Sequence, residues 1–201
     1  MDKREFRDRW ITHPLEVRAA EDGNGINVEG YAAVFNQRAD IGGWFFEQIA
    51  PGAFTDSLQR GDDVVFLINH DGLPLARTSA GTLTLTQDDH GLRMATTLDG
   101  SDPDALRIIG KMKRGDLSKM SFAFIADVEE WDDTGDQAVR TIKQASLFDV
   151  SIVTTPAYDG TDIGLRSLEA ARDLAKRTHN FNAARRRRMR MGLTQLGLEN
   201  G

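Results

Sequence analysis

The sequence predicts a mainly β protein with flanking helices, and more specifically a small antiparallel β-barrel, closed or nearly closed, with helices outside it. Three observations lead to this prediction: many short apolar or alternating segments, Gly- and Asp-rich turns between them, and one well-marked helix among them. Many short strands with one interposed helix are typical of such β architectures. The length of 201 residues suits one domain with an appendage.

The predicted strands are short and separated by turn residues. The strongest hairpin signal is Asp-Gly-Asn-Gly at 22–25, between two such segments. The run at 63–69 is continuously apolar, which is typical of a buried strand, and a brief helix is expected from Pro51 to near Gly61. The strand segments are 14–19, 26–35, 44–49, 63–69, 82–86, 92–98, 118–130, 138–147 and 148–154.

One longer helix has clear start and stop signals. Ser101 or Asp102 can cap its first turn, Pro103 is tolerated there, and Gly115 follows its basic end. Its predicted buried stripe consists of Leu106, Ile109 and Met112. This helix is the main helical element expected in the body.

Composition excludes several kinds of chemistry and location. The absence of cysteine excludes a disulfide framework, a thiolate zinc site, an iron–sulfur cluster and a cysteine nucleophile. No apolar run approaches the roughly 20 residues of a membrane span. The first residues lack the apolar core of a secretory signal. We therefore expect the protein in the cytoplasm of a cell or of an infected one.

The formal net charge of −6 is unevenly distributed. Residues 167–201 hold eight basic and three acidic residues, net +5, which leaves 17 basic and 28 acidic residues, net −11, in 1–166. We expect two parts: a folded β domain over 1–166 and a basic, partly helical C-terminal tail over 167–201. The apolar spacing of Leu168, Ala171, Leu174 and Ala175 favours an amphipathic helix in that tail.

Without cysteine, the available nucleophiles are serine, threonine, lysine and carboxylates. Among four histidines, His70 has a distinctive position at the end of the apolar strand 64–69. A histidine at the mouth of a buried strand is well placed to act as a general base. The alternative is that residues 69–72 form a turn with a polar lip. The other histidines are His13, His90 and His179.

Two further polar residues lie in apolar strand segments. Ser121 points to the face opposite Met120 and Phe122, although serines in strands are common and usually inert. Asp149 lies in the otherwise apolar segment 148–153, where an unpaired carboxylate is costly to bury. Asp149 therefore either forms an ion pair with a Lys or Arg or orients a histidine.

Taken in order, five blocks of the sequence resemble the tailed-phage prohead maturation proteases, over about residues 12–166. The blocks are GYAAVFN at 30–36, EQIAPGAF at 47–54, LINHD at 67–71, KMSFAF at 119–124 and FDVSIVTTPAY at 148–158. Two positions depart from the family pattern. Ala123 replaces a glycine that commonly follows Ser-Phe, and Asp149 stands where the family has Glu or Asp.

The resemblance implies a fold similar to that of the herpesvirus assembly proteases and a serine endopeptidase activity. Carried over by motif, Ser121 is the nucleophile, His70 the general base and Asp149 the residue that orients His70. If Asp149 does not have this role, Asp71 or Asp127 is the next candidate. No metal or organic cofactor is implied. The oxyanion-hole donors are expected among backbone N–H groups at 153–155 or at Arg166.

The implied substrates are the scaffold and the major capsid protein, cleaved inside the assembling prohead in the host cytoplasm. The protease is expected to cleave itself as well, and a homodimer is expected by analogy with the herpesvirus enzymes. The tail is either a helix packed on the body with a solvated end or a docking segment that is removed by self-cleavage. The rival functions are a catalytically silent capsid-assembly or scaffold component and a nucleic-acid-binding protein acting through residues 185–190.

Overall fold

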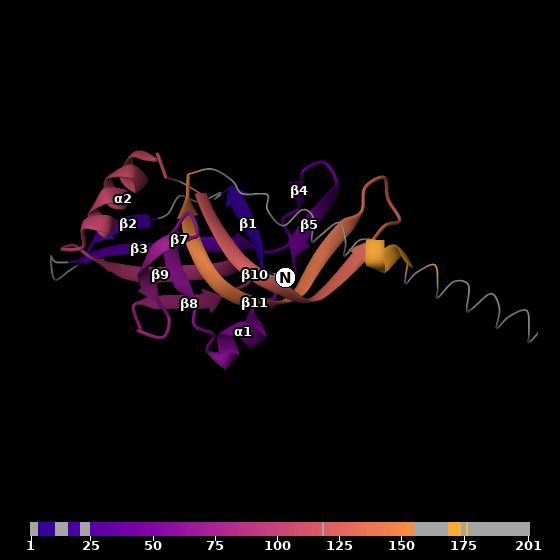
Figure 1. The fold of residues 1–201 in the computed structure, drawn as a ribbon, viewed down its shortest axis with the longest axis horizontal. Helices are drawn as coiled ribbons and strands as arrows, with labels where there is room; N and C mark the ends of the chain where they lie inside the picture. The colour runs from indigo at the N-terminus through magenta and orange to yellow at the C-terminus, as the bar shows by residue number, and fades with distance from the viewer. Residues whose placement is uncertain are drawn as a thin grey trace, which may run out of the picture. The chain divides into compact units, whose positions relative to one another are not determined.

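The structure is a computed structural model that describes residues 4–10, 16–20, 25–117, 119–154, 169–173 and 176. By its internal contacts the chain divides into two units, Met1–Ile163 and Gly164–Gly201. The sheets and the two helices discussed below belong to the first unit (Figure 1). In the second unit, residues 169–173 are helical, and most of the predicted tail, 167–201, lies outside the described residues.

The described residues form two sheets. The seven-stranded sheet has the order β1-β10-β11-β5-β4, with β6 beside β11 and β7 beside β6. Its strands are β1 (Glu5–Trp10), β4 (Ala39–Ile41), β5 (Phe45–Ile49), β6 (Val65–Ile68), β7 (Asp71–Arg77), β10 (Lys119–Asp132) and β11 (Val139–Val153). The four-stranded sheet has the order β2-β3-β9-β8, and its strands are β2 (Glu16–Ala19), β3 (Gly25–Val34), β8 (Leu83–Gln87) and β9 (Gly91–Asp99).

The mainly β prediction is confirmed, but the closed antiparallel barrel is wrong. The strands described here belong to two separate sheets, and two of the pairings are parallel. Both parallel pairings involve β11, whose 15 residues pair with β5 at one end and with β6 at the other. Turn signals and periodicity indicate where a strand lies, but they do not reveal which distant strand becomes its neighbour.

Strands β10 and β11 form one long antiparallel hairpin, visible as two curved ribbons side by side in Figure 1. The sequence predicted a break between 147 and 148, whereas β11 continues through both residues. The irregularity at this point is a register shift: Ala123 pairs with Asp149, and Phe124 pairs with Leu147. Phe148 is therefore the extra residue of a β-bulge. The bulge keeps the strand continuous but reverses the face of the sheet to which the following side chains point.

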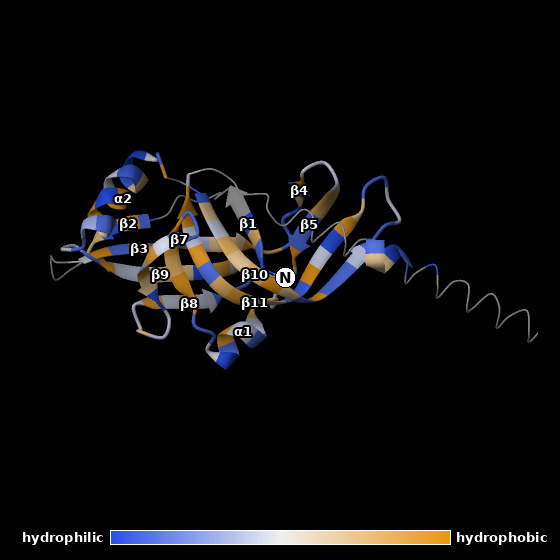
Figure 2. Ribbon diagram, viewed as in Figure 1, coloured by the Kyte–Doolittle hydropathy of each residue, from blue (hydrophilic) through white to orange (hydrophobic). Residues whose placement is uncertain are grey.

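The helices follow their sequence signals. In α2 (Pro103–Arg114), the Asp102 side chain accepts a hydrogen bond from the backbone N–H of Asp104 at 2.8 Å, and Gly115 caps the C-terminus with φ of 81°. The short helix α1 (Thr55–Arg60) ends at Gly61. The predicted stripe of α2 is wrong at Leu106, which is 53% exposed, because the face towards the core consists of Ala105, Ile108, Ile109 and Met112. Figure 2 shows this mixture of hydrophilic and hydrophobic residues along α2.

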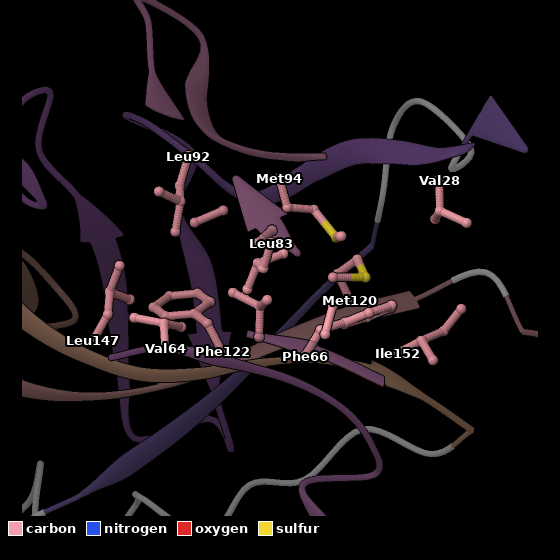
Figure 3. Packing of buried hydrophobic residues seen from close by; sticks show 14 of the residues in the cluster. Val28, Val64, Phe66, Leu83, Leu92, Met94, Met120, Phe122, Leu147 and Ile152 are labelled. Carbon is pink, nitrogen blue, oxygen red and sulfur yellow. The ribbon is translucent and has the colours of Figure 1, made fainter. Parts of the chain in front are cut away.

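The hydrophobic core lies between the two sheets. Leu92 and Met94 of the four-stranded sheet point towards Phe66, Phe122 and neighbouring residues of the seven-stranded sheet (Figure 3). These four side chains are fully buried. Burying one such side chain contributes about 1.5–3 kcal/mol relative to leaving it exposed. This packing fixes β10 and β11 rigidly from one face, so that their other face can carry polar side chains.

Candidate active site

The three residues singled out in the sequence lie in hydrogen-bond contact. His70 Nδ1 is 2.5 Å from Asp149 Oδ1, and His70 Nε2 is 2.6 Å from Ser121 Oγ. With the Nδ1 proton donated to the carboxylate, Nε2 is left to accept the proton of the Ser121 hydroxyl. The order hydroxyl, imidazole, carboxylate is the arrangement that activates a serine for nucleophilic attack.

Ser121 is held by the central hairpin. It lies on β10 between Met120 and Phe122, whose side chains are fully buried in the core. Because side chains alternate along a strand, the Ser121 side chain faces the other side of the sheet. Its partner across the hairpin is Ser151 on β11, so the two hydroxyl-bearing residues share one face.

Asp149 reaches this face because of the β-bulge at Phe148. Leu147 and Val150 are both core residues, although an odd number of positions separates them. An uninterrupted alternation from Leu147 would place Asp149 in the core as well. The extra residue at Phe148 reverses the alternation, so that Asp149 and Ser151 face His70 instead. Bulges occur frequently next to active sites, where they redirect a side chain in this way.

His70 enters the site from a left-handed turn. After β6 the chain turns at Asn69 and His70, with φ values of 53° and 58°, before β7 begins. This conformation is uncommon for residues other than glycine and costs about 1–3 kcal/mol each, so other contacts must hold it. Asn69 supplies two of them, because its Oδ1 accepts hydrogen bonds from the backbone N–H and the hydroxyl of Thr154 at 2.9 and 3.2 Å.

Two more residues touch the imidazole, and the sequence interpretation assigned neither of them a role. Ser151 Oγ donates to Asp149 Oδ1 at 2.8 Å and accepts from the His70 backbone N–H at 3.2 Å. The Phe6 ring packs edge-on against the His70 ring, with centroids 4.6 Å apart. Ser151 lies in the block FDVSIVTTPAY at 148–158, which is a usable signal, whereas nothing in the sequence singles out Phe6.

The site is secluded. Ser121 and Ser151 have no exposed surface, and the side chains of His70 and Asp149 are 10% exposed. A hydrogen bond between charged or polar groups is stronger in such surroundings than in water. The carboxylate and imidazole therefore hold each other in one orientation.

The remaining sequence candidates are not part of this cluster. Asp71 begins β7 opposite Ile68, and Asp127 accepts a hydrogen bond from Ser146 Oγ at 2.6 Å. His90 packs against the Tyr31 ring. His13, His179 and Arg166 lie outside the described residues. Among the expected oxyanion donors, the Thr154 N–H is already donated to Asn69.

No metal-binding cluster of three or more His, Asp or Glu side chains occurs within the described part of the chain. None of its described helices is long and apolar enough to cross a membrane.

Two open cavities, of about 440 and 350 Å³, lie away from the His70 cluster. The first lies on the four-stranded sheet around Asn27 and Thr96, and the second lies beside the turn from Asp132 to Val139.

Comparisons with known proteins show to which family the chain belongs. A search of curated protein sequences finds no match. Among solved structures, the bacteriophage T4 capsid assembly protease gp21 is similar, with a TM-score of 0.49 and 10% identity over 76% of this chain and 99% of that one. The profile of the family described as "Caudovirus prohead serine protease" matches residues 13–174. That match spans most of the sequence and agrees with the resemblance of the five blocks, so the chain belongs to the caudovirus prohead serine protease family.

Proposed function

We propose that this protein is an active serine endopeptidase of phage prohead maturation, with Ser121 as nucleophile, His70 as general base and Asp149 as the residue that orients the imidazole. The observation that supports this most strongly is the pair of hydrogen bonds on the two nitrogens of one ring, 2.6 Å to Ser121 Oγ and 2.5 Å to Asp149 Oδ1. Membership of a serine protease family supports the same reaction.

The proposed reaction begins when Ser121 Oγ attacks the scissile carbonyl carbon while its proton moves to His70 Nε2. Asp149 stabilises the imidazolium that forms. Collapse of the tetrahedral intermediate expels the amine, which takes the proton from Nε2, and leaves an acyl group on Ser121. Water then attacks the acyl group with His70 again acting as base, which releases the carboxylic acid and restores the hydroxyl.

The proposed substrates are the scaffold and the major capsid protein of the assembling prohead in the host cytoplasm, and the protease itself.

The residues 167–201 are the proposed docking or packaging segment, with net charge +5 against −11 for 1–166. Opposite net charges favour association of such a segment with an acidic assembly. Intact mass of wild type and of Ser121→Ala after long incubation tests self-removal; identical masses contradict it.

The decisive experiment is serine-directed labelling combined with processing. Wild-type protein should react with a fluorophosphonate probe at Ser121, as located by peptide mass spectrometry, and should process its co-expressed capsid precursor. Ser121→Ala and His70→Ala should do neither while unfolding at a temperature close to that of wild type. Full processing by Ser121→Ala contradicts the proposal.

A matched control distinguishes activation from mere presence of a serine. Ser146 on β11 donates to Asp127 at 2.6 Å and accepts from Arg60 at 2.8 Å, so it has a carboxylate neighbour but no histidine. Ser146→Ala should therefore be labelled at the wild-type rate. Failure of wild type to react with the probe favours the catalytically silent assembly component instead.

A further inference from the structure

Ser151 is a buried hydroxyl that contacts the acid, the ring and the backbone of the base at once. Its Oγ is 2.8 Å from Asp149 Oδ1, 3.2 Å from His70 Nδ1 and 3.2 Å from the His70 backbone nitrogen. The residue has no exposed surface. These contacts come from two different segments, the strand β11 and the turn after β6.

A hydroxyl has one proton to donate and can accept others, which assigns the direction of each bond. The Ser151 proton goes to the Asp149 carboxylate, since a carboxylate can only accept. The same oxygen then accepts the His70 backbone N–H. Ser151 thereby links the side chain of the acid to the main chain of the base.

This link acts on the two degrees of freedom that determine the geometry of the site. The proton donated by Ser151 fixes the rotation of the Asp149 carboxylate. Its Oδ1 also accepts the hydrogen bond from His70 Nδ1. The accepted N–H holds the left-handed backbone of His70, with φ of 58°, which is costly without support. Without Ser151, the carboxylate can rotate and the turn can relax, and either change moves Nε2 away from Ser121.

We infer that Ser151 is a fourth, positioning residue of the reaction, an inference that rests on the proposed serine protease function. It does not touch the reacting atoms; it acts through Asp149 and His70. Its loss should lower the rate of the chemical step and leave ground-state binding unchanged, because misplacement of a catalytic group by about 1 Å can reduce the rate 100-fold.

The test compares Ser151→Ala with Ser57→Ala, a control of the same chemistry. Ser57 is 1% exposed, donates to Asp62 at 2.7 Å and accepts the backbone N–H of Leu147 at 3.0 Å, so its hydrogen bonds go to neither His70 nor Asp149. Each substitution removes one donor and one acceptor from a buried serine. Both should therefore lower the unfolding temperature by a similar amount.

The first readout is the kinetics of Ser121 labelling by a fluorophosphonate probe. In Ser151→Ala the maximal labelling rate should fall about 10- to 100-fold while the half-saturating probe concentration stays unchanged. Ser57→Ala should label as wild type does. Ser151→Thr, which retains a hydroxyl on a β-branched side chain suited to strands, should recover most of the rate. A Ser151→Thr protein that folds but labels no faster than Ser151→Ala contradicts the inference.

The second readout is the proton NMR signal of His70 Nδ1–H, assigned by its loss in His70→Ala. This signal should shift in Ser151→Ala and stay unchanged in Ser57→Ala. If the two alanine variants agree in labelling rate and in this signal, the positioning role is overturned while the proposed function stands. If wild type is not labelled but the signal shifts only in Ser151→Ala, the proposed function fails and the positioning of His70 by Ser151 is supported.

Discussion

Two clusters of buried polar side chains share strand β1 and differ in what they can do. Phe6 packs on His70 of the His70 cluster (Ser121, His70, Asp149 and Ser151), whereas its neighbours Glu5 and Arg7 belong to an ionic cluster with Glu47 and Arg140. Alternation along β1 sends these residues to opposite faces. The same strand thus supports both clusters.

In the ionic cluster every guanidinium is matched by carboxylates. Arg7 bonds to Glu47 at 2.6 and 2.9 Å, and Arg140 bonds to Glu5 at 2.6 and 2.8 Å. Burial alone would lower the pKa of Arg7 and of Arg140, but attraction by Glu5 and Glu47 more than offsets it, and both pKa values are raised. Neither guanidinium loses its proton near neutral pH.

The His70 cluster holds one carboxylate, one imidazole and two hydroxyls, joined by hydrogen bonds. An imidazole accepts and returns a proton at neutral pH, which a guanidinium does not. The ionic cluster is therefore suited to holding strands together, whereas the proposed reaction needs the imidazole of the His70 cluster, which can change its protonation.

The largest expected effect comes from Asp149→Asn. The amide has the shape of the carboxylate but cannot stabilise an imidazolium, and it favours the wrong tautomer of His70. Labelling or hydrolysis through Ser121 should fall about 10⁴-fold, as the loss of the charge does in related triads. The free energy of unfolding, measured with urea, should change little. Near-normal activity would move the role of third residue to Asp71 or Asp127.

Arg140→Met should have the next largest effect, on stability rather than chemistry. The substitution leaves Glu5 and Glu47 buried without one of their cations, and breaking a buried pair in this way destabilises a protein by about 3–5 kcal/mol. Urea unfolding measures the loss. Arg60→Met, at a solvent-exposed pair with Asp62, is the control and should lose much less stability. Equal losses would mean that the ionic cluster contributes no more than a surface pair.

Asn69→Ala tests the turn that delivers His70. Alanine loses both bonds to Thr154 and is strained at φ of 53°, so stability should fall by about 1–3 kcal/mol and the labelling rate should fall as well. Asn36→Ala, at φ of 55°, carries a similar backbone cost away from the site. If both variants keep the wild-type labelling rate, the turn does not control the position of His70.

The smallest expected effect concerns the exposed pair of Asp63 and Arg77 beside the β6–β7 hairpin. Hydrogen bonds from Arg77 and Ser79 lower the pKa of Asp63 from 3.8 to about 2. The folded protein therefore binds this proton less readily than the unfolded chain, so the stabilisation is present above about pH 4 and is lost as the pH falls towards 2. In Asp63→Asn, urea unfolding between pH 4 and 2 should show a slightly weaker pH dependence. An unchanged dependence contradicts the pairing.

Local signals in the sequence predicted much of the fold. The caps at Asp102 and Gly115 correctly bound α2, and the predicted strands on either side of 22–25, and those at 82–86 and 92–98, pair as neighbours. β1, β4 and β7 were not predicted: β4 is only three residues long, and β7 contains Gly72 and Pro74, which are poor strand formers. Their strand conformation comes from pairing with distant segments, which local patterns do not encode.

The residues of the candidate site were likewise predictable only in part. His70, Ser121 and Asp149 could be singled out because each is a polar residue in or beside an apolar strand. Ser151 and Asn69 lie in two of the five blocks, but their roles could not be assigned, because these depend on a bulge at Phe148 and a left-handed turn, which appear only once the register of β6, β10 and β11 is known. Phe6 depends on the pairing of β1 with β10.

The complete burial of Ser121 has a kinetic consequence. For a protease that uses the proposed mechanism, a peptide reaches Oγ only in molecules that have opened, so the observed rate is the intrinsic rate multiplied by the open fraction. An open fraction of one in a thousand corresponds to an opening free energy of about 4 kcal/mol. Any molecule that binds the open form preferentially increases that fraction, and a substrate is such a molecule. Dense substrate would then act as the activator of its own cleavage.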